Sequence, residues 1–246
     1  MTRATDELAG KVVFVTGGGG GIGSAIARDL HDLGATVYVA GRRRQVLESV
    51  CAGYERIRPV VLDVTDPASW QDALATVGAI DVLITSAAVI HRAPFAESTP
   101  EQWDEMWRTN VMGALYGAHA VLPGMRERGW GRIVLVSSAA AVLGLPQRVG
   151  YCATKGAVEA MGRALAIEVA GSGVTVNVVA PGAFRTEINA GLYEEGAPST
   201  KSLLASVPEG RFGDTRELAY AVRFLVAAGY SQGATITVDG GWTIQG

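Results

Sequence analysis

Short apolar runs alternate with longer segments of helical periodicity along nearly the whole chain. The runs predicted to be strands are residues 12–16, 36–40, 59–64, 81–86, 132–137, 174–179 and 235–238. Helices are predicted between them over 22–33, 43–51, 101–122 and 151–170, and a further helix begins at Asp66 with Pro67 in its first position. The strand runs are apolar almost throughout, which is typical of strands covered on both faces. The pattern therefore predicts an α/β fold with one doubly wound, mainly parallel sheet of about seven strands.

The length of the chain and its unbroken alternation predict one domain over residues 1–246. The longest irregular stretch, residues 183–209, is rich in Gly, Ser, Pro and Thr and is predicted to be a lid over the substrate. With 48% apolar and 18% charged residues the composition excludes disorder. The net charge of −3 gives no sign of a nucleic-acid or membrane partner. No signal peptide, membrane span or metal-ligand spacing is recognised, which predicts a cytoplasmic protein without a metal site.

The turn after the first predicted strand is built almost entirely of glycine and reads TGGGGGIG over 16–23. Glycines let the backbone approach a pyrophosphate, and the helix that follows attracts negative charge at its N-terminus. The position of this turn, between a strand and a helix, predicts a Rossmann-type dinucleotide site at Gly17, Gly21, Ile22 and Gly23. The alternative is a tight turn that binds no ligand.

The end of the second predicted strand indicates which dinucleotide is bound. An acidic residue about 20 residues after the glycine turn normally holds the ribose 2′-hydroxyl, but Gly41 stands there and Arg42, Arg43 and Arg44 follow. Because no carboxylate stands at this position and guanidinium groups follow directly, the sequence predicts NADP(H) in preference to NAD(H). Arg42 is predicted to bind the 2′-phosphate, and Arg44 is predicted to point into solvent. The alternative is that the arginines only open a solvated helix. Asp63 is predicted either beside the adenine ring or at a helix N-terminus.

Hydroxyl and ammonium groups follow the fifth predicted strand. Ser138 lies at its carboxyl end, and Tyr151 and Lys155 are four residues apart on the next helix, where they share a face. A tyrosine hydroxyl has a pKa of about 10, and a neighbouring ammonium group together with a cationic nicotinamide favours its phenolate form. The three side chains therefore suggest acid–base chemistry near neutral pH.

Together these motifs resemble the short-chain dehydrogenase/reductase family over essentially the full chain. The matching features are the TGGGGGIG turn, Asp63, Asn110, Ser138, the YCATK run at 151–155, the NVVAPG run at 177–182, Thr186 and the VDGG run at 238–241. The resemblance implies that Tyr151 exchanges a proton with the substrate oxygen and that Ser138 hydrogen-bonds this oxygen. It implies that Lys155 lowers the tyrosine pKa and binds the nicotinamide ribose, and that Asn110 holds a water in the proton relay.

The resemblance also extends the cofactor site. It implies contacts from Val64 and Ala87, and from Pro181, Gly182 and Thr186 beside the nicotinamide. The chain departs from the family after the fourth predicted strand, where Thr85-Ser86-Ala87-Ala88 replaces the usual Asn-Asn-Ala-Gly. Small residues are kept, and hydroxyl groups are available to replace the amides that tie neighbouring strands.

The predicted function is an NADP(H)-dependent oxidoreductase that acts on a small-molecule ketone or secondary alcohol, similar to 3-oxoacyl-acyl-carrier-protein reductases. A carrier-bound substrate needs a basic docking surface, for which Arg126, Arg128 and Arg132 are candidates. The alternatives are a sugar, polyol or cyclic-alcohol dehydrogenase, and a non-catalytic regulator that only binds the cofactor. The predicted helix over 151–170 has apolar or small residues nearly all round, and together with the family resemblance this predicts a homotetramer.

Overall fold

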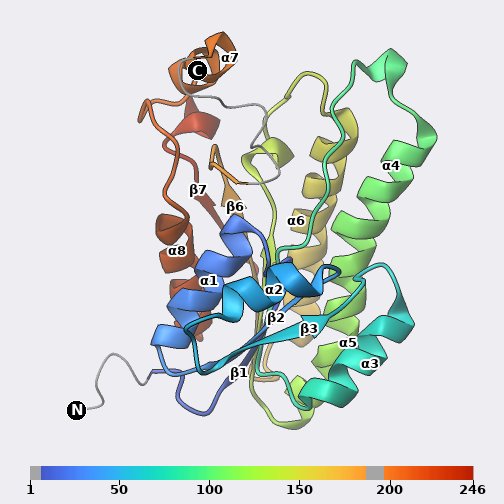
Figure 1. Cartoon of the computed structure of the whole chain (residues 1–246), viewed down its shortest axis with the longest axis vertical. Coiled ribbons are helices and arrows are strands. Elements are labelled where there is room, and N and C mark those ends of the chain that lie inside the picture. The colour runs from blue at the N-terminus through green and yellow to red at the C-terminus, as the bar shows by residue number, and fades with distance from the viewer. Residues whose placement is uncertain (1–6, 187–196, 246) are drawn as a thin grey trace.

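The computed structural model describes residues 7–186 and 197–245. Within them, seven parallel strands form one sheet in the order β3-β2-β1-β4-β5-β6-β7 (Figure 1), which confirms the predicted fold class. The strands are β1 (Val12–Thr16), β2 (Thr36–Gly41), β3 (Ile57–Val61), β4 (Val82–Thr85), β5 (Gly131–Val136), β6 (Val174–Pro181) and β7 (Thr235–Val238).

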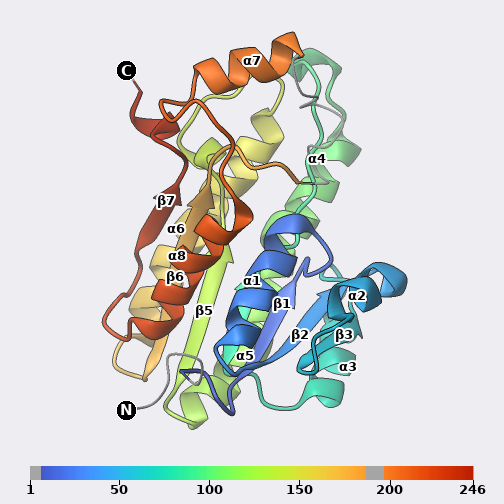
Figure 2. The same ribbon diagram turned by 60° about the vertical axis from the view of Figure 1, so that its left-hand side comes forward.

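Helices cover both faces of this sheet (Figures 1 and 2). The helices are α1 (Gly21–Asp32), α2 (Arg44–Cys51), α3 (Pro67–Val77), α4 (Pro100–Trp107), α5 (Gly113–Glu127), α6 (Val149–Val169), α7 (Pro198–Ala205) and α8 (Thr215–Ala227). Buried side chains of α1, α2 and α8 pack on one face, and those of α3, α5 and α6 pack on the other. Strand side chains alternate between the two cores, with Val13 and Val15 in one and Phe14 in the other.

The order of the strands places a crevice at one edge of the sheet. β1 has β2 on one side and β4 on the other. The chain leaves β1 into α1 on one face and leaves β4 toward α5 on the opposite face. In sheets of this kind the two connections separate outside the carboxyl ends of the strands, and ligands bind between them.

Two predicted elements differ from the structure by three or more residues at one end. The helix predicted over 101–122 is interrupted, because a π-helical segment at Arg108–Met112 joins α4 to α5, and α5 continues to Glu127. The third strand was predicted over 59–64 but spans Ile57–Val61. β2 ends at Gly41, which pairs with Val61 and whose carbonyl accepts a last bond from the Leu62 amide at 3.0 Å, so the paired part of the third strand ends there.

The predicted lid, residues 183–209, is only partly within the described chain, since residues 187–196 lie outside it. The described part contains α7, which was not predicted. Figure 2 shows α7 at the end of the molecule toward which β5 points, which is the edge that carries the crevice.

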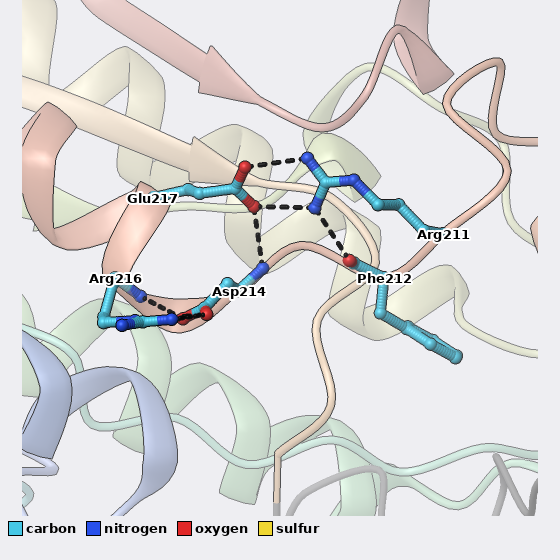
Figure 3. A network of polar contacts seen from close by, with 5 residues as sticks. All are labelled: Arg211, Phe212, Asp214, Arg216 and Glu217. Carbon is cyan, nitrogen blue, oxygen red and sulfur yellow. Dashed lines mark hydrogen bonds and ion pairs between the residues drawn. The ribbon is translucent and has the colours of Figure 1, made fainter.

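Helix α8 was also not predicted, although its start carries a clear local signal. The Asp214 side chain accepts a hydrogen bond from the Arg216 amide, and Glu217 accepts one from the Asp214 amide at 2.8 Å (Figure 3). Arg211 binds both oxygens of Glu217 at 2.8 and 2.7 Å, and Arg216 binds Asp214. Hydrogen bonds from these arginines lower the pKa of Asp214 and that of Glu217 to about 2. The network fixes the chain between α7 and α8.

Candidate active site

The glycine turn after β1 packs against neighbouring backbone more closely than a side chain would allow. Gly17 has a φ of 64°, and a Cβ atom on it would lie 2.7 Å from the amide nitrogen of Ala87. A Cβ atom on Gly23 would lie 2.4 Å from the carbonyl oxygen of Gly17. The turn therefore brings bare backbone to the N-terminus of α1, which fits the approach of a pyrophosphate.

A cleft of about 280 Å³ extends from this turn along the carboxyl edge of the sheet. Most of the predicted site residues line it, namely Gly17, Gly21, Ile22, Gly23, Arg42, Asp63, Val64, Ala87, Tyr151, Lys155, Pro181 and Thr186. Asn110, Ser138 and Gly182 are not among the lining residues. The Gly182 amide donates a hydrogen bond to the Val238 carbonyl at 2.9 Å, and a Cβ atom on Gly182 would collide with Asp239. Gly182 therefore packs β6 against the segment that follows β7.

The cleft also has lining residues that were not singled out from the sequence. Ser137 is one of them, and its hydroxyl lies 3.1 Å from the Lys155 carbonyl oxygen and 3.2 Å from the Glu159 carboxylate. The signal for it was the pair of serines at the end of the fifth strand. Its buried hydroxyl ties the residue after β5 to α6 at Lys155 and Glu159.

Arg42, Arg43 and Asp63 meet at the end of the cleft next to β2 and β3. Asp63 accepts hydrogen bonds from the amide and hydroxyl of Thr65, at 2.9 and 2.8 Å, and these bonds with the Arg42 charge lower its pKa. The N-terminus of α3 is capped by Asp66 and not by Asp63. Asp63 is therefore a charged wall of the cleft beside Arg42.

The run at 85–88 lacks the amide side chains that tie neighbouring strands in the family, and a residue of β1 makes such a connection here. The Thr16 hydroxyl accepts a hydrogen bond from the Ala87 amide at 3.2 Å, and the Thr16 carbonyl accepts one from the Ser86 amide at 3.2 Å. The hydroxyl group that ties the end of β1 to the end of β4 is therefore that of Thr16 in β1. It is not a hydroxyl group of the run at 85–88.

Asn110 lies in the π-helical segment between α4 and α5, and its side chain is buried. Its Oδ1 accepts from the Val89 amide at 2.8 Å, and its Nδ2 donates to the Val89 carbonyl at 3.0 Å and to the Thr154 hydroxyl at 3.1 Å. The amide thus joins the segment after β4 to α6. The side chain therefore positions these two segments, and the water-holding role that the family resemblance implies for Asn110 stays a prediction.

Ser138 and Tyr151 meet at the carboxyl edge of β5. Ser138 caps the short 3₁₀ turn Ala139–Ala141, and its hydroxyl is hydrogen-bonded with Tyr151. Burial raises the pKa of Tyr151, and the bond with Ser138 and the charges of Arg92 and Arg148 oppose this increase. The sequence predicts a pKa lowered by Lys155 together with a cationic nicotinamide, and that prediction concerns the enzyme with its cofactor bound. In the protein alone, burial outweighs the favourable charges and holds the pKa above its usual value.

Lys155 is almost fully buried beneath Tyr151, with its Nζ 5.6 Å from the centre of the tyrosine ring. Its ammonium group donates to the Val136 carbonyl at 2.9 Å. Burial lowers the pKa of Lys155 to about 8. The side chain also lines the cleft, next to Tyr151.

The basic residues considered for docking a carrier protein do not form one exposed patch. The Arg132 guanidinium is buried and donates to the carbonyls of Val226, Gly131 and Gly173. Arg128 donates to the Ile80 carbonyl at 2.6 Å. These arginines also lie before or at the start of β5, at the edge of the sheet opposite Tyr151.

Comparisons with known proteins agree with this geometry. A family model described as short chain dehydrogenase matches residues 11–196. A 3-oxoacyl-[acyl-carrier-protein] reductase of Haemophilus influenzae is 34% identical over 241 residues, which cover 95% of this chain and 98% of the relative. A 2,5-dichloro-2,5-cyclohexadiene-1,4-diol dehydrogenase of Sphingobium indicum is 33% identical over 250 residues, covering 97% and 98%.

Solved structures give the same picture. A gluconate 5-dehydrogenase from Burkholderia cenocepacia, in complex with NADP and tartrate, superposes with a TM-score of 0.91 and 33% identity. The match covers 99% of this chain and 100% of that one. Among the described helices of the present structure, none is long and apolar enough to cross a membrane.

Proposed function

Because the chain belongs to the short chain dehydrogenase family and is an oxidoreductase, we propose that Tyr151 is the group that exchanges a proton with its substrate. The observation that carries the proposal is the hydrogen bond between Ser138 and Tyr151, a lining residue of the cleft whose ring centre lies 5.6 Å from the Nζ of the buried Lys155. A bound nicotinamide supplies the hydride for ketone reduction and accepts it in alcohol oxidation. The glycine turn fits such a dinucleotide, and the lining of the cleft includes both the arginines after β2 and the Tyr151 and Lys155 side chains.

In ketone reduction, the Tyr151 hydroxyl gives its proton to the carbonyl oxygen as hydride adds to the carbonyl carbon, and the product is a secondary alcohol. A raised tyrosine pKa keeps this hydroxyl protonated at neutral pH, which suits the acid role. Ser138 shares the hydrogen bond and orients the substrate oxygen. Lys155 holds a positive charge beneath the ring, and Asn110 fixes α6 relative to β4.

We infer that the substrate is a free small molecule and not an acyl group on a carrier protein. The Arg132 guanidinium is buried and bonded inside the protein, which removes one of the three candidate docking cations. The likeness to the gluconate 5-dehydrogenase supports the second candidate, a dehydrogenase of sugar or polyol compounds. A turnover screen of acyl thioesters, cyclic ketones and keto sugars decides between these substrate classes.

NADP(H) is the proposed cofactor, in preference to NAD(H). Arg42 and Arg43 line the cleft where the adenosine ribose would lie, and Gly41 places no carboxylate beside it. Arg44 is exposed and lies 3.8 Å from Glu48, so it belongs to the surface of α2. The NADP in the gluconate 5-dehydrogenase structure supports the same choice.

The proposed assembly is a homotetramer. Helix α6 buries Val158, Ala166 and Val169 against the sheet, yet Ala160, Ala164 and Ile167 form an exposed apolar stripe on its outer side. Ile167 and the C-terminal Ile244 are 79% and 85% exposed. Burial of this stripe against a second copy would remove that apolar area from water. Light scattering that detects a stable monomer at micromolar concentration would overturn this assembly.

The catalytic proposal is tested by Tyr151→Phe, which removes the proton and keeps the ring. With a panel of ketones and reduced cofactor, we expect kcat to fall by about 100- to 10,000-fold. Cofactor binding, followed by protein fluorescence, should change little. Unchanged turnover in the variant would show that Tyr151 is not the proton donor.

A further inference from the structure

A buried carboxylic side chain lies on α6 one turn beyond Lys155. Glu159 is 9% exposed, and because it follows Lys155 by four residues the two side chains share a face of the helix. Burial of such a group is costly unless the protein supplies hydrogen-bond partners for it. The proposed reaction assigns no part to Glu159, so its place in the interior calls for another reason.

The Ser137 hydroxyl connects Glu159 with the lining of the cleft. Its oxygen lies 3.2 Å from Glu159 Oε1 and 3.1 Å from the backbone carbonyl oxygen of Lys155. Because a hydroxyl group carries one hydrogen, the two acceptors share it. The other Glu159 oxygen lies 3.9 Å from the Arg163 guanidinium, which is mostly exposed. Ser137 thus bonds Glu159 from the interior, and Arg163 approaches it from the surface.

The end of β5 also binds the side chain of Lys155. The Lys155 ammonium group donates to the carbonyl oxygen of Val136 at 2.9 Å, and Val136 directly precedes Ser137. This strand end therefore holds Lys155 twice, by its side chain at Val136 and by its backbone carbonyl at Ser137. A shift of Ser137 away from α6 would move the Val136 carbonyl with it, because the two residues share a planar peptide bond.

Backbone contacts set the distance between Ser137 and Glu159. The Ser137 amide donates to the Val179 carbonyl at 2.8 Å, which continues the pairing of β5 with β6. A Cβ atom on Gly162 would lie 2.7 Å from Cγ2 of Val178, so α6 lies close against β6 just beyond Glu159. The strand end and the helix therefore have little freedom to separate, and the hydroxyl and the carboxylic group are held facing each other.

We propose that Glu159 is a positioning residue for Lys155. By holding the Ser137 hydroxyl, it fixes the end of β5. The Val136 carbonyl at that end then keeps the Lys155 ammonium group in the wall of the cleft. The inference rests on the proposed function, in which Lys155 places a positive charge beneath the Tyr151 ring. A misplacement of about 1 Å in such a group can lower a rate by roughly 100-fold.

Kinetic variants test whether Glu159 acts as a hydrogen-bond acceptor. Glu159→Leu removes the acceptor and should lower kcat for a reducible ketone by about 10- to 100-fold, with little change in the KM of that ketone. Glu159→Gln keeps an acceptor oxygen for Ser137. It should recover roughly half of that loss on a logarithmic scale, because a neutral hydrogen bond has about half the strength of a charge-assisted one. Glu168→Leu, the same change at an exposed position of α6, is the matched control and should leave kcat unchanged. Equal losses in Glu159→Leu and Glu159→Gln would overturn the proposal.

A double variant tests whether Glu159 acts through Ser137. Ser137→Ala removes the hydroxyl group with almost no change of shape, and it remains informative if Glu159→Leu does not fold. It should lower kcat by a factor similar to that of Glu159→Leu. If both residues act through one bond, the Ser137→Ala, Glu159→Leu double variant should be no slower than the slower single variant. Losses that multiply in the double variant would show that Glu159 acts independently of Ser137, against the proposal.

A measurement without turnover follows Lys155 directly, since the chain has three lysines. These are Lys11, Lys155 and Lys201. In protein with 13C-labelled lysine, the ε-carbon signal of each lysine reports its own titration. Glu159→Leu and Ser137→Ala should move the Lys155 midpoint to lower pH, because a weakened bond to the carbonyl at the end of β5 disfavours the charged form. The other two lysines are internal controls and should not move.

The titration distinguishes this proposal from the catalytic one. If Tyr151→Phe keeps full turnover while the Lys155 midpoint moves in both variants, the proposed function fails and the positioning of Lys155 stands. If Tyr151→Phe is inactive and the Lys155 midpoint of both variants equals that of the wild type, Glu159 does not position Lys155, and the catalytic role of Tyr151 stands.

Discussion

Asn110 pairs with both backbone groups of Val89, accepting from its amide at 2.8 Å and donating to its carbonyl at 3.0 Å. The side-chain amide therefore takes the place of a neighbouring strand at a position just beyond the end of β4. Its second Nδ2 hydrogen reaches the Thr154 hydroxyl on α6. One side chain thus links the wall of the cleft to the helix that carries Tyr151 and Lys155.

The first prediction concerns this link. Asn110→Leu leaves the Val89 amide and carbonyl without their partner, and unmade hydrogen bonds of buried groups cost about 1–3 kcal/mol each. We expect the free energy of unfolding to fall by about 2–4 kcal/mol, measured by urea denaturation, together with a loss of kcat. Thr154→Val removes only one bond of the set and should have a smaller effect. An Asn110→Leu variant with an unchanged denaturation midpoint would contradict the linking role.

The second prediction concerns the buried ammonium group of Lys155. Its pKa is about 8 in the folded protein against an ordinary value of 10.5, so between these values the unfolded chain binds more protons than the folded one. Stability contributed by this group therefore rises with pH through that window. Relative to Lys155→Met, the wild type should gain about 2 kcal/mol of unfolding free energy between pH 7 and pH 9.5.

This comparison is made by denaturant unfolding at several pH values. Lys155→Met should lose cofactor affinity and turnover, although it removes a costly buried charge. Lys201→Met, on the exposed surface of α7, is the control and should show no such trend with pH. A constant difference between wild type and Lys155→Met across the range would mean that Lys155 keeps its ordinary pKa.

The third prediction concerns acid stability at the start of α8. Asp214 and Glu217 have pKa values lowered to about 2, so they stabilise the fold above their ordinary pKa values and lose this effect as the pH falls toward 2. Asp214→Asn with Glu217→Gln should therefore lower the melting temperature at pH 6 and flatten its decrease between about pH 4.5 and pH 2. Glu127→Gln on α5 is the matched surface control. Parallel melting curves for the double variant and wild type would contradict the network's contribution.

The fold and the cofactor cleft could be predicted from the sequence because their signals are local. Apolar runs identify strands, and glycine is needed where Gly17 and Gly23 meet other backbone. The partner of Asn110 could not be found in the same way, because Val89 is 21 residues away in the sequence. Their contact depends on how the segment between α4 and α5 packs against the end of β4. The Asp214 and Glu217 pair was a local signal for α8 that the pattern analysis missed.

The electrostatics of the site are the part that sequence spacing predicts least well. Tyr151 and Lys155 share a helix face as expected, but the pKa of the tyrosine depends on how much of its surroundings exclude water. That is a tertiary property, and here burial outweighs the nearby charges. Sequence spacing likewise did not reveal that Arg92, from another segment, acts on the Tyr151 hydroxyl.

The last prediction concerns the choice of cofactor. A Cβ atom on Gly41 would meet only Leu47 at 3.7 Å, an ordinary contact, so a side chain at this position fits without disturbing β2. Gly41→Asp therefore introduces a carboxylate that accepts from a ribose 2′-hydroxyl and repels a 2′-phosphate. Arg42→Ala removes a guanidinium group from the same end of the cleft. Each change shifts the balance from NADP(H) toward NAD(H).

The measurement is kcat/KM for both cofactors with one reducible ketone. The wild type should favour NADPH by about 10- to 150-fold, the range for one charge-assisted hydrogen bond, and the double variant should favour NADH. Arg44→Ala is the control, because Arg44 faces Glu48 at the surface and should leave the ratio unchanged. The preference of the wild type should also weaken as salt rises, since the 2′-phosphate contact is charged. A wild type that prefers NADH, or a double variant with the same ratio as the wild type, would show that Gly41 and Arg42 do not select the cofactor.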